Sequence, residues 1–113
     1  MQLFELGAQV IPGVQSVPSV WHTPGHSSFI LTAGDEQLLV AGDAFMSVPL
    51  GVHNPWFEPL ADHVPEKGPR GRFELLERAA QGGMLVSSFH VPHPGLGRVE
   101  AESSMRFRWR PAA

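Results

Sequence analysis

The apolar residues of this chain fall into short runs, which predict a fold made mostly of strands. Runs over residues 28–33 and 37–41 flank Gly34-Asp35-Glu36, a pattern typical of a hairpin with a glycine-containing loop. The second run is continuous rather than alternating, which favours a strand buried on both faces. Weaker patterns predict strands over residues 4–10 and 14–21, and the prolines near the second suggest a sheet edge.

One helix is predicted over residues 72–81, where Phe73, Leu76 and Ala80 recur at helical spacing. Pro69 precedes it, and Gly82-Gly83 ends it. Further strands are expected over 84–89, 97–101 and 105–109. The order of elements is therefore strands, a long loop, a helix, a strand and a closing hairpin, which indicates an α/β (α+β) fold with mostly one mixed or antiparallel sheet.

Residues 46–71 form the long loop of this prediction, because they are rich in proline and lack periodicity. Loops of this length in compact domains are usually functional. Its apolar side chains, together with Phe45, predict a pocket suited to a small hydrophobic ester or lactone; they are Leu50, Trp56 and Phe57.

Length and composition place limits on the function. A chain of 113 residues is expected to form a single domain over 1–113. Its net charge of −3 argues against binding to nucleic acid or to an anionic membrane surface. It contains no cysteine, so a metal site must use histidine and carboxylate. With no signal peptide or membrane helix evident at this stage, a cytoplasmic protein is the expectation.

Three residues stand where strands are predicted to end or begin, namely His26, Asp43 and His90. Imidazole nitrogen and carboxylate oxygen on rigid supports are the ligands of hydrolytic metal sites. Each residue also has a simpler interpretation: a turn residue, a capping aspartate or an edge histidine. The other histidines have weaker spacing and are interpreted as loop or supporting residues; they are His22, His53, His63 and His93.

Together these segments resemble the C-terminal half of metallo-β-lactamase-fold hydrolases, in particular the lactonase and organophosphate-hydrolase-like branch. The resemblance covers nearly the whole chain and rests on five segments: residues 12–27 with the motif His22-Thr23-Pro24-Gly25-His26-Ser27, then 39–44, 72–79, 89–97 and 109–111. It implies half of an αββα sandwich, with His26 and His90 each binding one metal ion and Asp43 bridging both as the catalytic aspartate. Zinc is the implied metal, with manganese, iron or cobalt as alternatives.

The family's His-x-His-x-Asp-His motif is missing from this sequence. By the resemblance, each metal ion would keep too few protein ligands, because catalytic zinc normally has about three. The sheet would also leave an apolar face uncovered. We therefore expect a homodimer, or a complex with a separate N-terminal-half chain. The alternative function is a non-catalytic remnant or a metal-binding or interaction module; a cupin-type barrel is disfavoured.

Overall fold

The computed structural model describes residues 3–45, 47–58 and 62–112, and its strands form one mixed seven-stranded sheet. The strands lie in the sheet in chain order. All neighbours are antiparallel except β4 and β5, which are parallel. The strands are β1 (Gln9–Ile11), β2 (Val14–Pro18), β3 (Ser27–Ala33), β4 (Glu36–Gly42), β5 (Leu85–Ser88), β6 (Leu96–Ala101) and β7 (Phe107–Pro111).

The helix α1 (Gly68–Gln81) connects the two parallel strands, as a parallel crossover requires. A π-helical turn η1 (Val48–Val52) and a 3₁₀ turn η2 (Pro65–Lys67) precede it. A proline stands in its first turn, where a missing N–H costs nothing, and Gly82 caps its carboxyl end. Within the described residues, no helix is long and apolar enough to cross a membrane.

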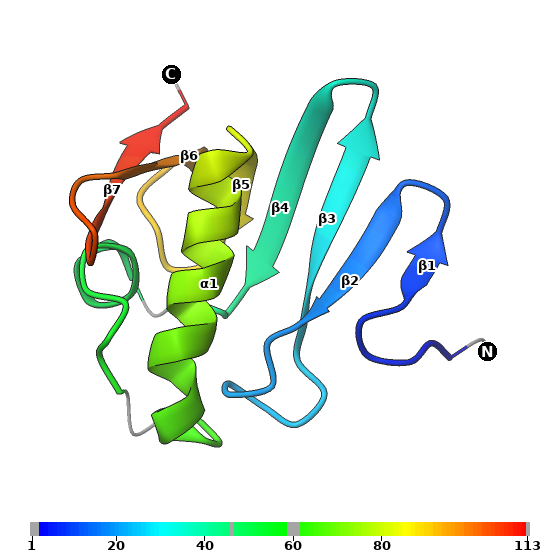
Figure 1. Ribbon diagram of the computed structural model, residues 1–113, viewed down its shortest axis with the longest axis horizontal. Coiled ribbons are helices and arrows are strands. Elements are labelled where there is room, and N and C mark those ends of the chain that lie inside the picture. Colours follow the sequence, from blue (N-terminus) through cyan, green and yellow to red (C-terminus); the bar gives the residue numbers. More distant parts are fainter. Residues whose placement is uncertain (1–2, 46, 59–61, 113) are drawn as a thin grey trace.

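The core lies between α1 and one face of the sheet, as Figure 1 shows. Leu75, Leu76 and Ala79 of α1 are buried there. The strands contribute side chains from alternate positions, which the pairing of Ile30 with Leu39 places on one face. The buried strand residues of this core are Ile30, Leu39, Ala41, Val86, Val99, Phe107 and Trp109.

The opposite face of the sheet, which we call the open face, carries a second row of apolar side chains. Strand pairing aligns four of them across β2 to β5: Val14, Leu31, Leu38 and Leu85. Phe29 and Val40 form a second cross-strand pair beside them. These side chains are partly buried or exposed, and Phe4 packs edge-on against Phe29. In this chain alone, β4 is therefore fully covered on one face only.

The prediction of one mixed sheet with one main helix is confirmed. Several details were wrong. The last strand, β7, spans Phe107–Pro111, not residues 105–109. Strand β1 spans only Gln9–Ile11, not residues 4–10. Strand β2 ends at Pro18 and is paired with β1 on one side and β3 on the other, so β1 rather than β2 is the edge strand. Helix α1 begins at Gly68 rather than Arg72, because a proline in the first turn is compatible with a helix.

The predicted long loop contains η1, η2 and the first turn of α1, while its residues 46 and 59–61 lie outside the described part of the chain. Phe45, predicted to line an apolar pocket, is instead fully buried in the core. Trp56 stacks on Phe73 of α1, with ring centroids 5.0 Å apart. Phe45 and Trp56, both predicted to line a pocket, therefore contribute to packing within the fold.

Candidate metal centre

The parallel pairing of β4 and β5 brings two of the predicted site residues to one edge of the sheet. Asp43 follows the last residue of β4, and His90 lies two residues beyond the end of β5. Their strand ends are paired through Gly42 and Ser88. Strand β3 is antiparallel to β4, so its start, and His26 before it, lie at the same edge. Sites in open α/β sheets gather beyond the carboxyl ends of strands.

The structure brings the three predicted residues into contact around Asp43. Its Oδ1 lies 3.2 Å from Nε2 of His90, and its backbone N–H donates to Nε2 of His26 at 3.1 Å. The Asp43 carboxylate is partly exposed, and His90 is exposed. The three residues therefore lie together where β4 and β5 end, with His90 at the side chain of Asp43 and His26 at its backbone. Their role as metal ligands stays a prediction.

His26 is held at both ring nitrogens. Nδ1 lies 2.5 Å from the hydroxyl of Ser19, and Nε2 accepts from the backbone of Asp43. Burial lowers the pKa of His26, and the nearby His22 lowers it further, against smaller opposing effects of Asp43 and Asp62. The neutral imidazole is therefore favoured, which is the form that binds metal ions.

Gly42 sets the distance between His26 and Asp43. Its φ is +59°, a conformation that favours glycine. A Cβ at this position would lie 2.9 Å from Nε2 of His26, closer than van der Waals contact permits. Only glycine lets the backbone of Asp43 reach the ring of His26.

We expect Gly42→Ala to destabilise the fold by about 2–3 kcal/mol, since it adds backbone strain to a clash with a ring fixed at both ends. Gly34→Ala is the matched control, because Gly34 has φ +60° but no atom within 4 Å of an added Cβ. Denaturant unfolding of both variants measures the difference. Equal losses would contradict a tight contact between Gly42 and His26.

His90 also has a backbone conformation rare for a non-glycine residue, with φ +62°. The chain reaches it through Phe89, whose N–H donates to the carbonyl of Gly42 at 3.1 Å. Such conformations are costly and persist only where the surrounding structure enforces them, and they are found mostly at functional sites. The strained backbone at His90 therefore supports a functional role for this corner of the fold.

His22 is the residue at this site that the sequence did not single out. Its Nε2 lies 3.6 Å from Oδ2 of Asp43, and its Nδ1 lies 3.2 Å from Oδ1 of Asp62. Its ring meets that of His26 edge-on, with centroids 5.2 Å apart. The four-residue spacing of His22 and His26 around a Pro-Gly turn was the available signal. The other histidines expected to have minor roles are exposed: His53, His63 and His93.

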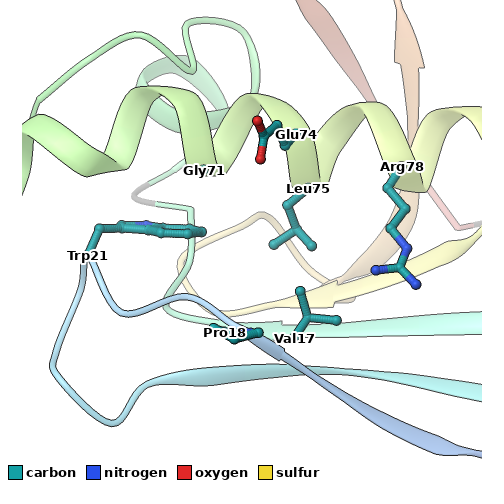
Figure 2. A pocket seen from close by; sticks show the side chains of 7 residues that line it. All are labelled: Val17, Pro18, Trp21, Gly71, Glu74, Leu75 and Arg78. Carbon is teal, nitrogen blue, oxygen red and sulfur yellow. The ribbon is translucent and has the colours of Figure 1, made fainter. Parts of the chain in front are cut away.

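Two surface hollows among the described residues are lined by other parts of the chain. One of about 300 Å³ separates β2 from α1, where the ring of Trp21 lies against Gly71 (Figure 2). Another of about 330 Å³ lies at the far end of the sheet and reaches Leu31, Leu38 and Leu85 of the open face. Neither contains a histidine or Asp43. A substrate pocket at the candidate site is therefore not formed by these two hollows.

Solved structures similar to this chain were found by comparison of the folds. A hydrolase named AbOPH, of the β-lactamase superfamily, matches 97% of this chain with a TM-score of 0.87 and 26% identity. AidC, a dizinc quorum-quenching lactonase, matches 99% with a TM-score of 0.86 and 21% identity. A probable metal-dependent hydrolase from Staphylococcus aureus matches 99% with a TM-score of 0.77 and 18% identity.

The chain is part of a metallo-β-lactamase fold. It spans 38%, 38% and 40% of the lengths of these three proteins. Neither a protein-family model nor a curated protein sequence matches it. The resemblance inferred from the sequence motifs is confirmed at the level of the fold.

The metallo-β-lactamase fold implies a metal ion, and the donors at this edge have suitable chemistry: imidazole nitrogens and one carboxylate. Within the described residues, however, no three histidine, cysteine, aspartate or glutamate side chains are placed to hold a metal ion. The donors fit part of a site, with Asp43 between two imidazoles, and further donors are needed to complete it.

Proposed function

We propose that this chain is one half of a metal-dependent hydrolase that cleaves an ester, lactone or phosphoester, and that it needs a complementary half for full activity. The observation that carries the proposal is the Asp43 carboxylate between two imidazole nitrogens, at the edge where the parallel strands β4 and β5 end. The fold supports it, because the structural neighbours are hydrolases and two of them are described as dizinc or metal-dependent.

Asp43 is the central residue of this proposal. Its two oxygens face different imidazoles, Oδ1 toward His90 and Oδ2 toward His22, which is the arrangement a bridging carboxylate needs. His26 and His90 are the imidazole ligands expected from the sequence. Zinc suits these donors, as do manganese, iron and cobalt. When bound, the metal supplies a water of lowered pKa as the nucleophile.

The need for a complementary half rests on two observations. The described residues do not supply three ligands for one ion, whereas catalytic zinc normally has about three protein ligands. The open face also leaves a row of apolar side chains of β2 to β5 partly exposed, and a patch of this kind usually marks an interface. A second copy of this chain or a chain with the missing half would meet both needs. The cytoplasmic location expected from the sequence stays a proposal.

Metal content and hydrolysis test the proposal together. We expect the dilute chain to be a poor hydrolase of a lactone or phosphotriester. The metal-dependent turnover per chain should increase with protein concentration, because copies of the chain then assemble. Asp43→Asn should remove this turnover. Asp35→Asn is the control, since Asp35 lies in the exposed β3–β4 turn. Full turnover by a verified monomer, or turnover unaffected by Asp43→Asn, would contradict the proposal.

A non-catalytic binding module is the second candidate, and the incomplete donor set favours it. In that case the open face binds a partner chain, while the edge at Asp43 binds metal weakly or not at all. Elemental analysis of the assembled protein separates the two candidates. Near-stoichiometric zinc supports the hydrolase, and an empty site supports the module.

A further inference from the structure

The hollow between β2 and α1 is a slot with an apolar lining and a charged group at one end. Its volume is about 300 Å³, which is at the small end of the range for ligand pockets. Figure 2 shows the ring of Trp21 at one end and the side chain of Arg78 at the other. Between them lie Leu75 on the helix side and Val17 and Pro18 on the strand side. The two ends of the slot therefore differ in chemistry, aromatic at one and cationic at the other.

The aromatic end is fixed by contacts on both sides of Trp21. Its indole N–H donates to the carbonyl of Ala44 at 3.2 Å, and the residue is 6% exposed. Its ring lies so close to Gly71 that a Cβ there would be 2.3 Å away, so only glycine leaves room for it. Leu75 beside the ring is 4% exposed. An apolar ligand therefore meets a preformed surface and releases the water that covers it.

The cationic end carries an arginine whose charge is available to a ligand. Two charged residues of α1 line the slot, Glu74 and Arg78. Glu74 is paired with Arg70 at 2.9 Å, so its charge is balanced. Among the described residues, no ion pair involves Arg78. Its side chain extends from α1 toward β2 (Figure 2), so the slot offers one guanidinium group to a ligand.

Arg78 also has a simpler role, because a cation in the last turn of a helix interacts favourably with the helix dipole. The arginine alone therefore does not indicate a ligand, whereas its place at one end of an apolar slot does. A guanidinium group and a carboxylate form two parallel hydrogen bonds. One guanidinium group balances one negative charge, which suits a monocarboxylate better than a doubly charged phosphate.

We propose that this slot binds a small monocarboxylate with a flat apolar body. The body lies against Trp21 and Val17, and the carboxylate accepts from the guanidinium group of Arg78. The slot is on the helix side of the sheet, so it stays accessible when copies of the chain assemble through the open face. None of the donors around Asp43 lines it, so the inference does not depend on the proposed function.

The first test compares two ligands of the same shape on the unmodified chain. Phenylacetate carries the carboxylate, and phenylacetamide is its uncharged counterpart. We expect phenylacetate to bind with a Kd of about 1 mM, as a ligand of about ten non-hydrogen atoms can, and the amide to bind about tenfold more weakly. In proton–nitrogen NMR spectra, phenylacetate should shift the indole N–H resonance of Trp21. The indole resonances of Trp56 and Trp109, which do not line the slot, should stay in place.

The second test changes each end of the slot. Arg78→Gln should weaken phenylacetate about tenfold by removing charge-assisted hydrogen bonds, and should leave phenylacetamide unchanged. Arg108→Gln is the matched control, because Arg108 is exposed on β7 and does not line the slot. Val17→Phe fills the slot from β2 and should weaken both ligands. Circular dichroism checks folding, and the ligand comparison on the unmodified chain stands if Val17→Phe does not fold.

The outcomes decide whether Arg78 and Trp21 form one site. A shift of the Trp21 resonance, with tighter binding of the acid that is lost in Arg78→Gln and kept in Arg108→Gln, supports the inference. Equal binding of acid and amide, or equal losses in the two arginine variants, would show that Arg78 does not bind the carboxylate. A Trp21 resonance that does not respond to phenylacetate would show that the slot is not a ligand site. Either of these last two results overturns the inference.

Discussion

Replacing Arg72 by methionine is expected to destabilise the fold by about 3–5 kcal/mol, a large part of the stability of a small domain. The arginine side chain is buried and donates to Asp62, to Pro55 and to Phe57. Burial lowers the pKa of Arg72, and its hydrogen bond and charge interaction with Asp62 oppose that effect. Without the arginine, the buried carboxylate of Asp62 loses its compensating charge, and two carbonyls lose a donor.

Arg70→Met is the matched control on the same helix. Arg70 pairs with Glu74 at 2.9 Å, but both side chains are exposed, at 86% and 62%. Exposed pairs of this kind contribute about 0.5 kcal/mol or less. Denaturant unfolding of both variants gives the comparison. Arg72→Met combined with Asp62→Leu should recover part of the loss, because both buried charges are then removed. Similar losses for the two arginine variants would show that the Arg72–Asp62 pair does not stabilise the fold.

The predictable part of the site followed from local chain order. Asp43 and His90 were assigned from the apolar runs that precede them. In the structure, the helix between those runs forms a crossover, which the sequence analysis did not predict. A crossover makes β4 and β5 parallel, so their carboxyl ends share one edge. His26 joins them because β3 and β4 form a hairpin. Each step depends on neighbouring segments, which hydrophobic patterns describe well.

The contacts of Asp62 with His22 and with Arg72 could not be predicted in the same way. Asp62 lies 40 residues from His22 and ten from Arg72, in a segment without helical or strand periodicity. Its role depends on how the chain before α1 folds back over the helix, which is a tertiary contact rather than a pattern. Phe45 shows the same limit, because an aromatic residue after a strand can line a pocket or enter the core, and here it enters the core.

We expect the purified chain to form at least a dimer in solution, with a mass of two or more copies of 12.3 kDa. The described part of the chain covers one face of its sheet with α1 (Figure 1). The open face aligns apolar side chains across β2 to β5 and ends in a hollow of about 330 Å³ beside Leu31 and Leu38. Fully burying an exposed Val or Leu side chain contributes about 1.5–3 kcal/mol, so each of these partly buried side chains adds a fraction of that to an interface.

Leu31→Glu tests this face directly, because Leu31 is 37% exposed in the isolated chain and pairs with both Val14 and Leu38. The charge should weaken assembly tenfold or more, since about 1.4 kcal/mol corresponds to tenfold in affinity and a two-fold dimer carries the change twice. Leu50→Glu is the control, as Leu50 is similarly exposed, at 42%, but lies in η1 outside the sheet. Light scattering at micromolar concentration reads both variants, with circular dichroism to confirm folding. A stable wild-type monomer would show that there is no interface and that the open face is tolerated in water. Dissociation by Leu50→Glu but not by Leu31→Glu would show that the interface lies elsewhere.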